Sequence, residues 1–306
     1  MKRKVIQIAE STQLISLPRK WSLAHNIKKG DELEVEAKGN QLVISTEKGY
    51  AIEKVELNIE GWGVLTKRAV HALYKKGVDE IRLVFSHPQE IETVQKALGK
   101  EAVGYEMVEH GNNFCVIRHV SGELEDFDPI LRRAFLLLHS MAESTLEAIQ
   151  KGEFDKLKNI ALLEEANNRF TTSCRRFLNK KGYQNQRLVG SLYYIIEDLE
   201  NLADQYKYLC NYLYQHKDKR IKIRKEILEF FKEVNSMLKL FYEVYYKFDH
   251  EKLVAIGTAR KDMVAKAYHL FEKSGKNPIE MVMMHHLMVM MQKIFGFIGP
   301  LLVMQL

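Results

Sequence analysis

From Asp126 to its C-terminus the chain carries one repeated pattern, in which long stretches with apolar residues at helical spacing alternate with short polar connections. Asp128-Pro129 begins the first stretch, since proline is favoured in the first turn of a helix, and Gly152 ends it. Short connections make consecutive helices antiparallel neighbours, so the pattern predicts an all-α domain over residues 126–306, built from two three-helix bundles in tandem. The six helices are expected at 128–150, 153–181, 185–216, 219–248, 250–273 and 278–303.

Residues 50–121 alternate between strand and helix patterns. One helix is expected from Thr66, as its N-cap, to Gly77, and a second has Pro88 in its first turn and ends at Gly99. The order β-α-β-α-β-β predicts a small α/β sandwich, a sheet with helices on one face, with strands at 55–59, 80–85, 105–109 and 114–120. The sequence has no phosphate loop, dinucleotide fingerprint or nucleophile elbow. We therefore expect no enzyme, and favour a spacer or dimerisation module over a small-ligand site.

Residues 1–48 are predicted to form a third, very small domain of short strands. Pro18 opens one turn of helix over 19–24, and Gly39-Asn40 is a turn signal. The strands are expected at 5–8, 14–17, 32–38 and 42–44. Such a small unit without a cysteine or metal cluster cannot bury enough apolar surface alone, so we expect it to dimerise. The whole chain is thus expected to be a multi-domain α+β protein.

The formal net charge of +6 lies at the start of the chain. Residues 1–30 hold seven basic side chains and one acidic one, and the charges of residues 31–306 balance. A basic cluster on a short segment is typical of a polyanion-binding surface, because phosphates that lysine and arginine neutralise release their counterions. The alternative interpretation is a solvated terminus that keeps the protein soluble.

Three segments of the small domain resemble the AbrB/MazE/SpoVT family of swapped-hairpin DNA-binding domains: Leu17-Pro18-Arg19-Lys20, the segment 26–35, and Gln41-Leu42-Val43-Ile44. The resemblance implies a dimeric β-barrel, in which two chains interleave their hairpins, and double-stranded DNA as a partner. Ser11-Thr12-Gln13 stands where the family usually has glycine, and Ser22-Leu23 stands where it often has arginine. Contacts to DNA phosphates are expected from Lys2, Arg3, Lys4, Arg19 and Lys20, and Gln13 and Ser22 are the candidate base readers.

Acidic and amide side chains recur at helical spacing on two of the expected helices. Glu200 and Asp204 are four residues apart, Glu197 lies one turn earlier, and Glu164 and Asn168 repeat the spacing on the preceding helix. Such stacks offer hard oxygen ligands to Mg²⁺, Mn²⁺ or Fe, although acidic pairs at this spacing also occur by chance on exposed helices.

The six-helix layout, with the segments 164–170 and 197–204, resembles the PhoU family of phosphate-uptake regulators. That family carries paired acidic motifs on adjacent helices, which bind metal. The resemblance implies a metal site at Glu164, Asn168, Glu197, Glu200 and Asp204. Because Asn168 replaces the usual aspartate and the second bundle lacks the motif, we expect a single, weakly held ion (Mg, Mn, Fe or Zn) rather than a cluster.

An AbrB-like domain ahead of a PhoU-like bundle resembles the archaeal type of phosphate regulator. The leading hypothesis is a homodimeric, DNA-binding transcriptional regulator of phosphate uptake, whose bundle is a sensor or partner-binding module. The alternative is an adaptor that restrains a phosphate ABC transporter through protein contact, with the N-terminal domain serving only dimerisation. A transporter ATPase or a sensor kinase is the expected partner.

The cysteines and the last helix indicate in which cellular compartment the protein is expected. Three widely spaced cysteines and the lack of an apolar signal segment favour the cytoplasm. No membrane span is expected in the last helix, because His285-His286 and Gln292-Lys293 interrupt it. The seven methionines between residues 281 and 304 predict a packing or partner surface, with a soft-metal site at Met281, His285 and Met288 as the less favoured interpretation.

Overall fold

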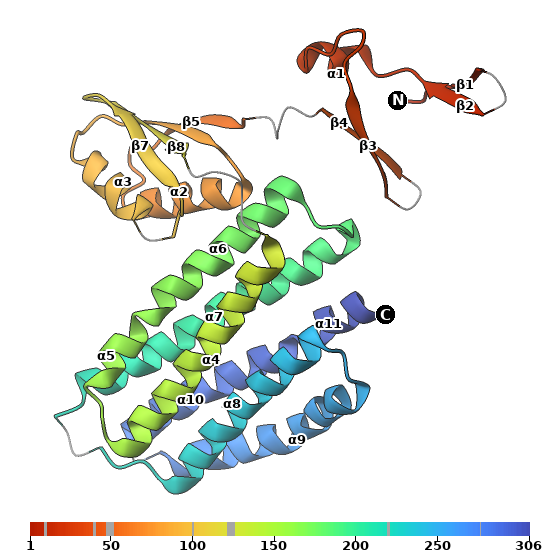
Figure 1. Cartoon of the computed structure of the whole chain (residues 1–306). Coiled ribbons are helices and arrows are strands. Elements are labelled where there is room, and N and C mark those ends of the chain that lie inside the picture. Colours follow the sequence, from red (N-terminus) through yellow and green to blue (C-terminus); the bar gives the residue numbers. More distant parts are fainter. Residues whose placement is uncertain are drawn as a thin grey trace. The chain divides into compact units, whose positions relative to one another are not determined.

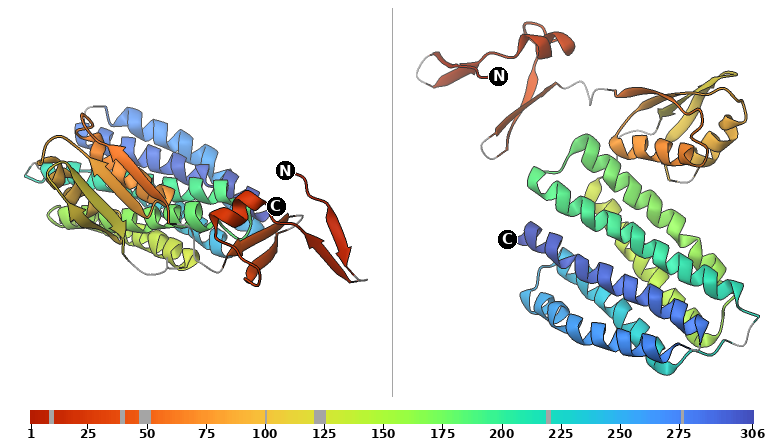
Figure 2. Two further views of the ribbon diagram at one scale, coloured as in Figure 1. Left: turned by 90° about the horizontal axis from the view of Figure 1, so that it is seen from above. Right: turned by 180° about the vertical axis from the view of Figure 1, so that it is seen from behind.

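The structure is a computed structural model of the chain and describes residues 1–8, 11–38, 41–46, 52–99, 101–120, 126–218, 221–275 and 277–306. It divides into two compact units, Met1–Ala51 and Ile52–Leu306 (Figures 1 and 2). The prediction of an α+β chain is confirmed, because the first unit is made of short strands and the second combines a sheet with long helices. The turn predicted at Gly39-Asn40 lies outside the described residues.

The N-terminal unit contains two separate antiparallel hairpins and one short helix. Its elements are β1 (Val5–Ile8), β2 (Thr12–Ile15), α1 (Arg19–Ala24), β3 (Leu33–Lys38) and β4 (Gln41–Thr46). The prediction of the second strand at 14–17 was wrong by two residues, because β1 pairs Ile8 with Thr12 and Val5 with Ile15. Pairing with the first strand, rather than the apolar run in the sequence, determines where β2 begins and ends.

Among the residues of this unit that the structure describes, the apolar side chains form no buried core. Val5 is 61% exposed and Leu42 is 67% exposed, and α1 has no buried residue. The same holds for most apolar residues of the two hairpins (Ile6, Ile8, Leu14, Ile15, Val35 and Val43). Isolated two-stranded hairpins are at best marginally stable in water, so these strands need a further apolar surface to cover them. The predicted barrel of two interleaved chains would provide it and stays a prediction.

The second unit begins with a four-stranded sheet in the order β5-β6-β8-β7. Its strands are β5 (Lys54–Asn58), β6 (Glu80–Val84), β7 (Tyr105–His110) and β8 (Phe114–His119). β5 and β6 are parallel, with α2 (Leu65–Lys76) between them in the chain, and the other pairs are antiparallel. α2 and α3 (Glu90–Leu98) cover one face of the sheet (Figure 1). Thr66 is not the predicted N-cap: it lies inside α2 and is buried.

Helices make up most of the rest of the second unit. They are α4 (Phe127–Lys151), α5 (Lys156–Ala161), α6 (Leu163–Lys181), α7 (Val189–Gln215), α8 (Lys225–Tyr246), α9 (His250–Lys273), α10 (Pro278–Gly296) and α11 (Ile298–Gln305). One continuous core of buried apolar residues runs through these helices, and a second, smaller core lies between the sheet and its helices.

Two of the predicted helices are interrupted. The helix predicted at 153–181 breaks at Leu162, where backbone hydrogen bonds span three residues instead of four, and no glycine or proline marks the break. The helix predicted at 278–303 breaks at Phe297. Pro300 explains this second break, because it has no N–H to donate to the carbonyl of Gly296.

The start of α8 also differs from the prediction. α8 begins at Lys225 rather than near 219, because the backbone N–H of Arg224 donates to the Glu280 carboxylate and Arg224 stays extended.

The methionine-rich helix α10 packs into the core. Met283, Met284, Met290 and Met291 are buried there, as the packing interpretation predicts. The segment Pro278–Gln305 is also long and apolar enough to cross a membrane, so the expectation of no membrane span stays a prediction.

Arg176 of α6 joins the sheet domain to the helices. Its guanidinium donates to the carbonyl of Tyr74 in the last turn of α2 (3.0 Å), to the carbonyl of Val78 just after α2 (2.7 Å), and to Asp79 Oδ1 (2.9 Å). The side chain is 1% exposed and lies over the ring of Tyr74. A buried cation is stable only when paired, so these contacts specify how α2 sits against α6.

Gly77 allows the end of α2 to pack closely against α6. It ends α2 in the left-handed conformation, with φ of 101°, which favours glycine. A Cβ at this position would also lie 3.2 Å from Cβ of Lys180 on α6. Both the conformation and the space at the end of α2 therefore require glycine.

We predict that Arg176→Met lowers the free energy of unfolding of this unit by about 3–5 kcal/mol, because Asp79 and two carbonyls lose a buried partner. Arg118→Met is the matched control, since Arg118 is 53% exposed and pairs with Glu80 on the surface; a cost of about 0–1 kcal/mol is expected there. Urea unfolding followed by circular dichroism measures both. Equal costs for the two variants would contradict the role assigned to Arg176.

Candidate functional site

The basic residues predicted to meet DNA phosphates all lie exposed in the N-terminal unit. Lys2, Arg3 and Lys4 precede β1, and Arg19 and Lys20 form the first turn of α1. Within the described part of this unit, none of the five has an ion-pair partner. Their charges are therefore available to a polyanion.

The two predicted base readers differ in their surroundings. Gln13 is exposed on β2, directly opposite Gln7 of β1. Ser22 is half-buried in α1, and its hydroxyl donates to the carbonyl of Pro18 (3.2 Å). The hydroxyl of Ser22 therefore has only its acceptor capacity left for a base, whereas the amide of Gln13 is open to solvent.

All five residues of the predicted metal site line one polar cavity of about 720 Å³ in the second unit. Glu164 and Asn168 come from α6, and Glu197, Glu200 and Asp204 come from α7, which runs beside it. The opposite wall is formed by α2, with Lys67, Arg68, His71 and Lys75, and by Glu101 after α3. We call this cavity the acidic cleft.

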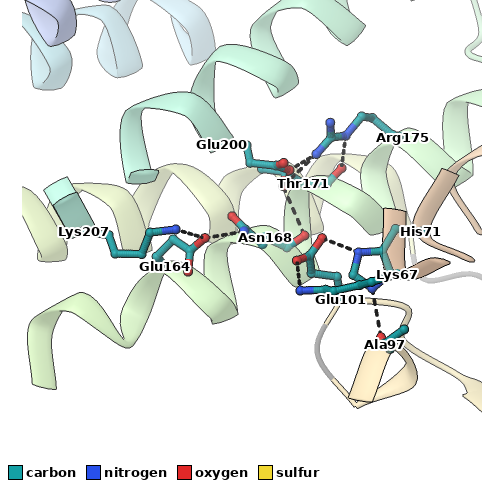
Figure 3. A network of polar contacts seen from close by, with 10 residues as sticks. All are labelled: Lys67, His71, Ala97, Glu101, Glu164, Asn168, Thr171, Arg175, Glu200 and Lys207. Carbon is teal, nitrogen blue, oxygen red and sulfur yellow. Dashed lines mark hydrogen bonds and ion pairs between the residues drawn. The ribbon is translucent and has the colours of Figure 1, made fainter. Parts of the chain in front are cut away.

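Lys207 of α7 pairs with Glu164 at one end of the acidic cleft (Figure 3). Its ammonium donates to Glu164 Oε1 (2.9 Å) and also to Asp204 Oδ1. Asn168 donates its amide N–H to the same oxygen of Glu164 (2.6 Å). Burial lowers the pKa of Lys207, but hydrogen bonds and charge from Asp204 and Glu164 outweigh it and raise the pKa above its ordinary value. The ammonium therefore remains charged at neutral pH.

Arg175 of α6 holds the carboxylates further along the acidic cleft. Its side chain has no solvent exposure, and its guanidinium pairs with both Glu197 and Glu200. Thr171 donates its hydroxyl to Glu200 (2.8 Å), so Glu200 accepts from two side chains of α6 (Figure 3). The α6–α7 contact is therefore charged and hydrogen-bonded on this side.

The facing wall carries its own ion pairs. His71 Nδ1 lies 2.9 Å from Glu101 Oε2, and His71 Nε2 lies 2.9 Å from the carbonyl of Ala97 (Figure 3). Lys67 approaches the other oxygen of Glu101 at 3.5 Å. Both ring nitrogens of His71 therefore face oxygen acceptors.

The five predicted site residues of α6 and α7 lie in the cleft, but the basic residues that pair with them were not predicted from the sequence. Lys207 follows Asp204 by three residues and Arg175 follows Thr171 by four, so both stand at the helical spacing used to find the acidic stacks. Extending that spacing to basic residues would have found them. His71 and Glu101 come from the sheet domain, and no local pattern links them to the bundle.

We predict that Glu101 makes the stability of the second unit sensitive to acid. Burial alone would raise its pKa, but the hydrogen bond and charge from His71, together with Lys67, lower the pKa of Glu101 from its ordinary 4.5 to about 2. A carboxyl whose pKa is depressed by folding stabilises the fold above its unfolded pKa, and this contribution is lost as the pH falls towards the folded value.

Replacement of Glu101 tests this linkage. Glu101→Gln should be less stable than the wild type near neutral pH, and the difference should shrink between pH 4.5 and 2. Glu60→Gln, at an exposed carboxylate of the same unit, is the control. A difference between Glu101→Gln and wild type that does not change with pH in urea unfolding would rule out the linkage.

Comparison with known proteins identifies one region. Residues 6–51 match the family described as "Antidote-toxin recognition MazE, bacterial antitoxin". No curated protein and no solved structure matches the chain. The match does not reach the sheet domain or the helices, so the PhoU-like bundle and the archaeal type of regulator stay predictions. The MazE/AbrB-type DNA-binding domain predicted from the sequence is supported at residues 6–51.

Proposed function

We propose that this protein is a DNA-binding regulator that acts as a homodimer through its N-terminal unit. The observation that carries the proposal is the overlap of two features: residues 6–51 match a MazE/AbrB-type family, and residues 1–30 hold the whole excess of positive charge. Domains of this type bind DNA and dimerise. The exposed side chains of Lys2, Arg3, Lys4, Arg19 and Lys20 are the phosphate contacts, and Gln13 and Ser22 are the candidate base readers.

Dimerisation follows from the exposed apolar side chains of β1 to β4. A second copy of the chain offers the same strands, so one two-fold interface covers both sets at once. The two basic segments then lie on one body and meet a pseudo-palindromic or repeated DNA site.

Regulation of phosphate uptake is the more specific part of the proposal. Its support is the resemblance of the segments 164–170 and 197–204, on α6 and α7, to the PhoU family. In this proposal the second unit senses phosphate status, directly or through a transporter ATPase or a sensor kinase. Mapping the genomic sites that the protein occupies in phosphate-rich and phosphate-poor cells tests it: occupancy away from phosphate-transport genes under both conditions would reject the phosphate role and leave DNA binding standing.

An antitoxin is the second candidate, and the description of the matching family favours it. An antitoxin needs a toxin as partner. Co-expression of the protein with its neighbouring genes separates the two candidates: rescue of cells from a toxic neighbour supports an antitoxin, whereas normal growth without this protein supports a regulator.

We predict that binding to promoter DNA weakens steeply with salt and that this dependence comes from the N-terminal unit. Lys4→Gln and Arg19→Gln should each reduce the slope of log K against log salt by about 1, because each removes one phosphate contact. Lys261→Gln is the matched control, an exposed lysine on α9 of the second unit. Fluorescence anisotropy with labelled duplex DNA at several salt concentrations provides the slopes.

Two outcomes would contradict the proposed DNA interface. One is the absence of binding even at low salt. The other is binding whose slope changes as much in Lys261→Gln as in Lys4→Gln, because the contacts would then lie on the second unit.

A further inference from the structure

We infer that Lys207 and Arg175 are built-in counter-cations, which hold the carboxylates of the acidic cleft in place of a divalent metal ion. The acidic spacing on α6 and α7 predicts a metal site, but the donor set in the structure does not fit one. The inference concerns residues of the second unit and does not depend on the proposed DNA binding.

Lys207 bridges two carboxylates, as a shared metal ion would. It contacts Glu164 on α6 and Asp204 on α7, and so ties the two helices together through one positive centre. Its side chain is 22% exposed and that of Glu164 is 9% exposed, so the pair lies largely out of solvent. A metal ion shared by these two carboxylates would have to displace the ammonium from between them.

Arg175 of α6 likewise bridges the next two carboxylates along α7. Its guanidinium is always charged and keeps a fixed planar shape. It is fully buried against Glu197 and Glu200, and the hydroxyl of Thr171 uses a further lone pair of Glu200. A cation that cannot lose its proton and cannot reach solvent makes these two carboxylates poor ligands for a second, divalent cation.

The remaining member of the predicted site, Asn168, points to a latent metal site. Its amide nitrogen donates to Glu164, and its Oδ1 is buried with no hydrogen-bond partner among the described residues. Oxygen atoms of Glu164 and Asp204 therefore flank Lys207 from two helices, and the Asn168 amide lies beside Glu164. Removing the ammonium without removing these oxygens should leave a set of hard oxygen ligands of the kind that Mn²⁺ and Mg²⁺ bind.

The consequence is a cleft whose charge balance does not depend on the supply of metal. The second unit then keeps the same α6–α7 contact with or without divalent ions. Any signal that it detects must act on other groups.

The test is Mn²⁺ binding to the full chain after dialysis against a chelator, measured by calorimetry and by the electron paramagnetic resonance signal of free Mn²⁺. The wild type should show no saturable site up to about 1 mM, the weak end of protein carboxylate sites. Lys207→Gln should gain one Mn²⁺ site, with an affinity at least tenfold higher than this limit of about 1 mM for the wild type. Adding Asp204→Asn to Lys207→Gln should remove that site.

Lys156→Gln is the matched control. Lys156 pairs with Glu153 three residues away, the same spacing as Lys207 and Asp204, but it is 65% exposed. This variant should bind no more Mn²⁺ than the wild type. Circular dichroism verifies that each variant is folded.

Two results would overturn the inference. The first is a stoichiometric Mn²⁺ site in the wild type that Glu164→Gln or Asp204→Asn abolishes; this measurement needs no Lys207 variant. The second is folded Lys207→Gln that gains no site.

Discussion

The described residues of the N-terminal unit have no hydrophobic interior of their own, and this constraint determines how that unit can fold. Each hairpin is only two strands wide, and side chains such as Val5, Ile15 and Leu42 lie exposed. Burying apolar surface is the main favourable term in folding, at roughly 25 cal/mol per Å². A second copy of the chain provides a matching surface of the same composition. In the proposed function, the basic segment at residues 1–30 forms a two-fold DNA-binding surface only when a second copy covers these apolar strands.

The second unit is stabilised in a different way, by cations placed between its layers. Arg175 and Arg176 are neighbours on α6 and both are buried, yet they serve different contacts. Side chains of adjacent helical residues point about 100° apart. Arg175 therefore reaches Glu197 and Glu200 on α7, while Arg176 reaches Asp79 and the end of α2. One turn of α6 thus fixes both the packing of the helices and the position of the sheet domain. Lys207 pairs with carboxylates at the other end of the acidic cleft.

Local patterns in the sequence predicted much of this fold. Gly77 and Gly152 end helices where expected, because each adopts the left-handed conformation that favours glycine. Helical spacing likewise brought Glu164, Glu200 and Asp204 to one cleft. The break at Leu162 could not be predicted, since it carries no glycine or proline. Nor could the contact of Arg176 with Asp79, because 97 residues separate the partners and neither lies in a recurring motif. The ion pairs of the cleft were missed for a related reason: its acidic residues were identified without the cations that contact them, and the metal site itself stays a prediction.

The central claim is that the strands of the N-terminal unit become a folded DNA-binding body only when two chains meet. The most direct measurement is hydrogen exchange of the backbone amides in β1 to β4 at a series of protein concentrations, with the amides of α7 as an internal reference. The account predicts that protection of β1 to β4 appears as dimers form and disappears on dilution, while α7 stays protected throughout. Protection of β1 to β4 that persists in the monomer would contradict it, and so would strands that exchange freely in the dimer.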